Sequence, residues 1–272
     1  MNLVNAEIFK LRTTSIWWIM GIILLPLYAA SLLVNWAQFA STPPDATDTS
    51  TQAEQVRVAL DPINVATSLY TSGQFFGVLI VLLLGAIIVT SEFFSLTATS
   101  TFLVTPRRES VILAKYVAAA IVGVVIWLLT TLLNLIFVPV IMNQLDLGNS
   151  LGEPAVWRAI GLNLLAFLLW AVLGVGLGVL IRNQIAATLI LAIVYTVGTS
   201  VIGLIFYLLT EYVAKWFENL QVLVPTAASQ LMISGTDLPG NPPRWVGAIV
   251  LIGYAVLAGV VGTLITKRRD IS

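Results

Sequence analysis

The sequence predicts an all-α integral membrane protein, with six transmembrane helices in a single transmembrane domain over residues 1–272. Of these residues, 58% are hydrophobic and only 10% are charged, and the mean hydropathy is +0.98. A soluble domain carries about 25% charged residues, so a water-soluble surface cannot be built here. The apolar residues come in long continuous runs rather than in the short alternating segments of a β-barrel, which favours helices.

Six stretches are long enough to cross the hydrocarbon, which takes about 20 apolar residues in a helix. Among them, only Arg158, next to the start of the fourth stretch, is charged. The predicted spans are residues 16–36, 69–90, 116–142, 157–181, 185–209 and 245–266.

The distribution of Lys and Arg predicts the orientation, because cytoplasmic loops carry the excess of both. One side of the predicted layout carries nine of them: Lys10, Arg12, Arg107, Arg108, Lys115, Arg182, Lys267, Arg268 and Arg269. The other side carries four: Arg57, Arg158, Lys215 and Arg244. We therefore expect a multi-pass protein of the plasma membrane with both termini in the cytoplasm. A cleaved signal peptide is the alternative for the first stretch, but the apolar run is too long for one.

Two segments outside the spans have helical patterns. Residues 2–14 are too polar to insert and predict an interfacial helix that carries Glu7, Lys10 and Arg12, although an ordinary flanking segment is the alternative. Residues 211–224 have an amphipathic pattern that suits a helix at the outer interface. Pro225 is expected to end that helix.

The composition excludes several kinds of chemistry. The chain has no His and no Cys, which removes the commonest general base and the commonest metal ligands. No phosphate-binding loop occurs, and the predicted spans hold no carboxylates that could relay protons. A net charge of zero gives no attraction to nucleic acid. We therefore expect no enzyme activity and no cofactor in this chain, so that energy for uphill transport must come from another polypeptide.

Apart from Arg158, the polar residues within the spans are uncharged. They have two interpretations: they line a substrate path or a subunit interface, or they form hydrogen bonds between packed helices. The residues concerned are Thr130, Asn134, Asn163, Thr188, Tyr195 and Thr199.

The predicted inner loop 91–115 is apolar enough to fold. Phe and Leu residues at helical spacing predict a short helix near the membrane, which Pro106 would end. Such a helix makes a docking surface for a soluble partner, and a simple interfacial linker is the alternative. The candidate coupling residues are Glu92, Phe93, Leu96, Thr97, Phe102, Arg107 and Arg108.

The chain resembles permease subunits of the type-2 ATP-binding-cassette (ABC) exporter family, especially those of actinobacteria. Four groups of residues carry the resemblance. They are the opening Ala6-Glu7-Ile8-Phe9-Lys10-Leu11-Arg12; Glu92-Phe93 with Thr97, Thr105-Pro106-Arg107-Arg108 and Ala114-Lys115; Leu173-Gly174, Gly176, Gly178 and Arg182-Asn183-Gln184; and Val224-Pro225-Thr226-Ala227-Ala228. Where this family usually has Gly and a basic residue in the loop, Leu96 and Thr99 stand here.

The resemblance implies a half-transporter in the lipid membrane. Two such chains, identical or related, would each bind a separate cytoplasmic ATPase subunit that holds ATP and Mg. A coupling helix near residues 92–103 would transmit the motion of the ATPase to the spans, with Glu92 pairing with a basic residue of the ATPase, with Lys10 or with Arg12. The uncharged interior suits a lipophilic or amphiphilic cargo. The alternatives are a membrane scaffold or assembly protein that recruits a soluble partner, and a facilitative channel.

Overall fold

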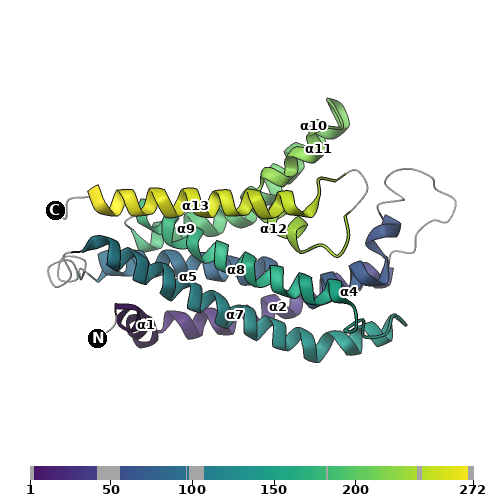
Figure 1. Ribbon diagram of the computed structural model, residues 1–272, viewed down its shortest axis with the longest axis horizontal. Helices are drawn as coiled ribbons and strands as arrows, with labels where there is room; N and C mark the ends of the chain where they lie inside the picture. The colour runs from purple at the N-terminus through teal and green to yellow at the C-terminus, as the bar shows by residue number, and fades with distance from the viewer. Residues whose placement is uncertain are drawn as a thin grey trace.

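The computed structural model describes residues 3–41, 56–95, 97, 107–181, 183–237 and 241–268, and every regular element within these ranges is a helix. In this part of the chain, six helical segments are long and apolar enough to span a membrane, as the sequence predicts. These segments are residues 16–40, 62–94, 108–144, 154–180, 184–212 and 244–267. Figure 1 shows them as an elongated bundle with α1 and the end of α13 at the same end.

Several spans are built from more than one helical piece. The helices are α1 (Leu3–Thr13), α2 (Ile16–Ser41), α4 (Pro62–Tyr70), α5 (Gln74–Phe94), α7 (Arg108–Gln144), α8 (Pro154–Leu180), α9 (Gln184–Ile193), α10 (Thr199–Tyr212), α11 (Phe217–Leu220), α12 (Pro225–Ile233) and α13 (Arg244–Arg268). A π-helical turn, Val194–Gly198, joins α9 to α10, and a 3₁₀ turn, Gln221–Leu223, follows α11.

Helix α5 forms the centre of the bundle. In the most apolar 18-residue stretch of its span, 89% of the residues are buried. The corresponding share is 11% for the fifth span and 17% for the first and the sixth. Helix α5 packs against α2, α7, α8 and α9. The fifth span instead leaves the bundle after its π-helical turn, since α10 has no buried residue and projects away with α11 (Figure 1).

Small residues bring α5 and α8 close together. A Cβ added at Gly174 would meet the backbone of Leu82, and one added at Gly178 would lie 2.8 Å from the Cα atom of Ala86. Near the other end of α5, the ring of Phe167 fills the space in front of Gly77. Helices in lipid associate by such close backbone packing.

The second span is interrupted between α4 and α5 at residues 71–73, which the sequence does not reveal. Gly73 adopts a left-handed conformation there, with φ of 83°. Asn134 of α7 donates hydrogen bonds to the carbonyl oxygens of Tyr70 (2.9 Å) and Ser72 (3.0 Å). These bonds satisfy backbone groups that the break leaves without helical partners, as a span in lipid requires.

Several boundaries differ from the sequence prediction, among them the start of the second span, which is Pro62 and not residue 69. The third span begins at Arg108, so residues 108–115 are the first two turns of α7 and not part of a loop. Residues 211–224 do not form one helix, because α10 ends at Tyr212 and α11 begins only at Phe217. Pro225 begins α12 instead of ending a helix, as suits a residue without an N–H in a first turn. Helix α12 packs against α8 and α13.

Candidate functional site

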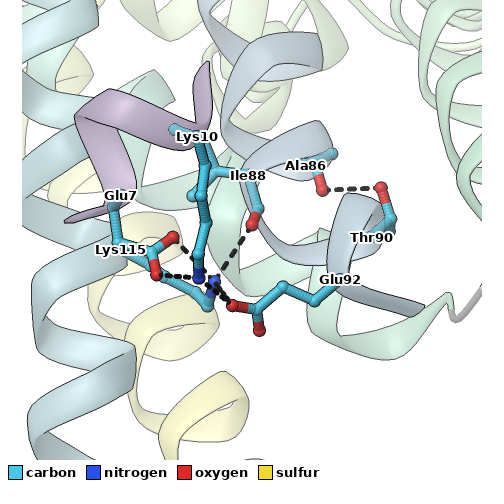
Figure 2. A network of polar contacts seen from close by, with 7 residues as sticks. All are labelled: Glu7, Lys10, Ala86, Ile88, Thr90, Glu92 and Lys115. Carbon is cyan, nitrogen blue, oxygen red and sulfur yellow. Dashed lines mark hydrogen bonds and ion pairs between the residues drawn. The ribbon is translucent and has the colours of Figure 1, made fainter. Parts of the chain in front are cut away.

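Four charged side chains from three helices meet at the end of the bundle where α1 lies (Figure 2). Glu7 and Lys10 come from α1, Glu92 from the last turn of α5, and Lys115 from the second turn of α7. We call these four residues the charge network. The chain thus joins its N-terminal helix to the two ends of the segment that connects the second and third spans.

Each ammonium group of the charge network contacts both carboxylates. Lys115 Nζ lies 2.8 Å from Glu7 Oε2 and 3.0 Å from Glu92 Oε1, and it also donates to the carbonyl oxygen of Ile88 at 3.1 Å. Lys10 Nζ lies 2.8 Å from Glu7 Oε1 and 2.6 Å from Glu92 Oε1. Two carboxylates and two ammonium groups therefore neutralise one another.

Three members of the charge network are buried. Glu7 and Glu92 are each 4% exposed and Lys115 is 3% exposed, while the Lys10 side chain is 40% exposed. Burial alone would lower the pKa of Lys10, but the hydrogen bonds and charges of Glu7 and Glu92 outweigh it and raise the pKa above 10.5. A buried charge without such a partner would be strongly destabilising.

The local structure explains how the charges come to lie together. Ile8 and Leu11 of α1 pack against the core, which turns Glu7 toward the bundle, and Lys10 follows at i,i+3 on the same face. Glu92 lies at the C-terminal end of α5, where the helix dipole disfavours an anion. The two lysines offset that repulsion.

A cavity of about 390 Å³ opens beside the charge network. Its lining includes Glu7, Lys10 and Glu92 together with Thr13 of α1 and Thr97 beyond α5. The N–H of Thr97 donates to the carbonyl oxygen of Glu92 at 2.9 Å. Thr97 is therefore bonded to the residue that joins α5 to α1.

The other predicted coupling residues lie around this site. Phe93 is half-buried against the core, Arg107 is exposed just before α7, and Arg108 begins α7. Leu96 and Phe102 lie outside the described residues. Arg12 was expected as a possible partner of Glu92; it is exposed, and the ion pairs of Glu92 are with Lys10 and Lys115.

The polar residues of the spans do not gather in one seam. Asn134 accepts a hydrogen bond from the Tyr28 hydroxyl at 2.9 Å and donates to the break in the second span. Thr130 and Thr188 donate to carbonyl oxygens of their own helices. The bonds of Asn134 join different helices, as the alternative interpretation expects, whereas those of Thr130 and Thr188 lie within one helix.

The remaining polar residues lie on α8 and in the fifth span. Tyr195, in the π-helical turn, donates to the carbonyl oxygen of Phe75 at 2.6 Å and packs edge-on against Trp170. Thr199 donates to the carbonyl oxygen of Tyr195 and lies 3.2 Å from the Thr226 hydroxyl. Asn163 is 2% exposed, and its Oδ1 atom has no hydrogen-bond partner among the described residues.

A comparison with known protein families gives one match. The model of the family described as "ABC-2 family transporter protein" matches residues 3–232. The chain belongs to the ABC-2 transporter family. This ABC-2 chain is thus a multi-pass membrane permease subunit of an ABC transporter, and its family implies an ABC ATPase as partner in general. No curated protein matches the chain.

Lys115 is the member of the charge network that was not predicted as a site residue, although it stood at the end of the predicted loop 91–115. Because a charged residue usually lies outside the bilayer, it marked the end of the apolar run. The signal was present in the residues around it: Val111, Ile112, Ala118 and Ala119 are buried at helical spacing on the same side of α7. An apolar stripe that continues on both sides of a lysine indicates that the lysine itself is buried.

Proposed function

We propose that this ABC-2 family chain is the permease subunit of an exporter whose ATP and Mg are held by a separate cytoplasmic ATPase. The charge network is the observation that supports this proposal. It fastens the N-terminal helix, the end of α5 and the start of α7 into one unit, at the two ends of the connection between the second and third spans. A partner that docks on that connection can move α1, α5 and α7 together as a rigid body.

In this proposal, motion of the ATPase is transmitted through α5. Since α5 is the most buried span, a push at its Glu92 end reaches α7 and α8 through direct packing. A second copy of the chain, or a related chain, would complete the transporter by covering apolar surface of the fifth span, of which little is buried within one chain. A lipophilic or amphiphilic cargo suits spans that expose many large apolar side chains along their length.

The test replaces Glu92 in the full chain, expressed with an ATPase that co-purifies with it. We expect Glu92→Ala to remain in the membrane and to lower export at least tenfold, while ATP hydrolysis continues. The variant Glu109→Ala is the matched control, because Glu109 is an exposed carboxylate that pairs with Lys267 near the same end of the bundle. Export that is unchanged in Glu92→Ala contradicts the proposed coupling.

A second variant keeps the test interpretable if Glu92→Ala fails to accumulate. Lys10 is the exposed member of the charge network, so Lys10→Met leaves the three buried charges in contact. We expect it to reach the membrane in normal amounts with weakened coupling. Full coupling in this variant, measured as cargo exported per ATP hydrolysed, would remove α1 from the proposed unit.

A further inference from the structure

An apolar groove of about 480 Å³ lies between α1, α2 and α7, with Leu84 of α5 among the residues that line it. Helix α2 packs mainly on α5, and the groove occupies the space between α2 and α7. Of the sixteen described residues that line the groove, only Arg12 is charged. In Figure 1, α1, α2 and α7 lie below the centre of the bundle, on the side away from α10.

The groove has a buried floor and exposed walls. Leu24 and Ala118 are fully buried, whereas Ile22 and Val125 are exposed. A Cβ added at Gly21 would meet no atom within 4 Å. The groove is therefore open space beside the backbone of α2, which the described side chains do not fill.

The length of the groove matches one leaflet of a bilayer. Its wall on α7 runs from Ala118 to Leu129, and its wall on α2 runs from Trp17 to Leu25. At about 1.5 Å per residue, these walls are about 16 Å and about 12 Å long, and half of a hydrocarbon core measures about 15 Å. The groove begins beside α1, at the charge-network end of the bundle. It thus has the length of an acyl chain in the leaflet at that end.

The polar groups of the groove lie at its mouth. Arg12, in the last turn of α1, is exposed and has no ion-pair partner among the residues that the structure describes. The nearby charge network is neutral in itself, so the positive charge of Arg12 is uncompensated. The Trp17 indole donates to the carbonyl oxygen of Arg12 at 3.3 Å, and Trp18 also lines the groove. Indole rings are typical of the head-group level of a membrane.

These features select a class of lipid. In hydrocarbon, an apolar groove gives an acyl chain little affinity, because the surrounding lipid tails are as apolar as the lining. The groove therefore positions a chain, and the head group decides which lipid is retained. A guanidinium forms charge-assisted hydrogen bonds with a phosphate. A lipid of net negative charge keeps this attraction in full, whereas the ammonium group of a zwitterionic lipid opposes it.

We infer that the groove holds one resident anionic phospholipid, with an acyl chain along α2 and α7 and its phosphate on Arg12. This lipid is a bound component of the protein and not its cargo. The site is formed within one chain, so retention of the lipid can be measured without nucleotide and without an ATPase. A failure of the proposed coupling therefore leaves this inference standing, and the reverse holds as well.

The experiment measures which lipid the full chain retains. The chain is placed in nanodiscs with equal amounts of phosphatidylglycerol and phosphatidylcholine that have the same acyl chains. Native mass spectrometry then counts the lipids that stay bound to each chain. We expect one bound phosphatidylglycerol, preferred over phosphatidylcholine about fivefold, which is the factor that one basic side chain near a membrane surface contributes.

The variant Arg12→Gln tests the head-group contact. We expect it to retain the two lipids equally, because the uncompensated charge at the mouth of the groove is removed. Arg107→Gln is the matched control, since Arg107 is exposed just before α7 and does not line the groove. It should keep the preference for phosphatidylglycerol.

The variant Gly21→Leu tests the acyl-chain contact. Its side chain would enter the groove, where a Cβ meets no atom. We expect this variant to lose retention of lipids with either head group. In detergent without added lipid its Tm should stay the same or rise, because leucine favours a helix more than glycine does. Gly253→Leu, on α13 with equally open surroundings, is the matched control and should retain the lipid.

Three results would overturn the inference. They are equal retention of the two lipids by the unmodified chain, an unchanged preference in Arg12→Gln, and unchanged retention in Gly21→Leu. A dimer that dissociates in Gly21→Leu would also overturn it, because a second copy of the chain would then cover the groove.

Discussion

At the residue scale, the charge network lets an apolar bundle hold full charges. Lys115 is 3% exposed and Glu92 is 4% exposed, yet each contacts a partner of opposite charge within 3.0 Å. The contribution of such a cluster to the free energy of unfolding depends on its having equal numbers of positive and negative charges. Removal of one member leaves an uncompensated buried charge. The four residues therefore act on stability as a set.

Lys115→Met is expected to destabilise the protein by about 3–5 kcal/mol, since it leaves Glu7 and Glu92 with only the half-exposed Lys10. The double variant Lys115→Met/Glu7→Gln restores the charge balance and should be more stable than Lys115→Met alone. Thermal unfolding in detergent, followed by tryptophan fluorescence, measures both. Additive losses in the double variant would show that the charges do not act together.

At the element scale, the approach of α5 to α8 depends on single glycines. A methyl group at Gly174 would contact the backbone of Leu82, which cannot move without separating the two helices. The same methyl group at Gly161, also on α8, meets no atom within 4 Å. The two positions therefore form a matched pair on one helix.

Gly174→Ala should lower stability by about 1–3 kcal/mol through overpacking. Gly161→Ala should leave stability unchanged or raise it, because alanine favours the helix by about 1 kcal/mol. The Tm of each purified variant decides between them. Equal shifts in both variants would show that helix propensity, and not the α5–α8 contact, controls this region.

The break in the second span depends on one amide. Asn134→Leu leaves the carbonyl oxygens of Tyr70 and Ser72 without its two hydrogen bonds and should cost about 1–3 kcal/mol. Asn143→Leu, at an exposed position of the same helix, is the control. Unfolding temperatures that are equal in the two variants would mean that other groups satisfy these carbonyls.

The six spans could be predicted because each contains an apolar run long enough to cross a bilayer. Not all of their ends could. Helix α4 begins at Pro62, ahead of its apolar run, where the Asp61 side chain accepts a hydrogen bond from the N–H of Ile63 and Pro62 suits a first turn. Its polar residues hid this start, because their partners lie elsewhere, as in the bond of Asn64 to Thr236, 172 residues later.

The candidate site could be predicted only in part, because some of its contacts join residues far apart in the sequence. Glu92 and Lys10 stood out by residue type and by position at the membrane boundary, and the structure brings them within 2.6 Å of each other. Lys115 did not stand out, because its burial depends on a carboxylate 108 residues away in the sequence. The apolar groove did not stand out either, since its residues come from four helices and are ordinary on each.

At the scale of the whole molecule, the bundle has a charged end with the charge network and an opposite end where α4 lies (Figure 1). The positive-inside rule predicts that the charged end, with α1 and the end of α13, faces the cytoplasm. The chain has no cysteine, so a single introduced thiol reports its own side of the membrane.

Lys267→Cys, at the end of α13, should react with a membrane-impermeant maleimide only after the cells are permeabilised. Glu153→Cys, exposed before α8 at the other end, should react in intact cells. Mass shifts on a gel measure both reactions. The reverse pattern would invert the orientation and place the groove in the outer leaflet.

The distance in sequence between Glu7 and Lys115 also sets an order of events during biosynthesis. When α1 leaves the ribosome, Lys10 is present beside Glu7, but Lys115, the buried lysine that also pairs with Glu7, has not yet been translated. The amino-terminal helix must therefore wait at the membrane surface until the third span has been inserted. Docking of the first helix made, against the third span, is thus a late step of assembly.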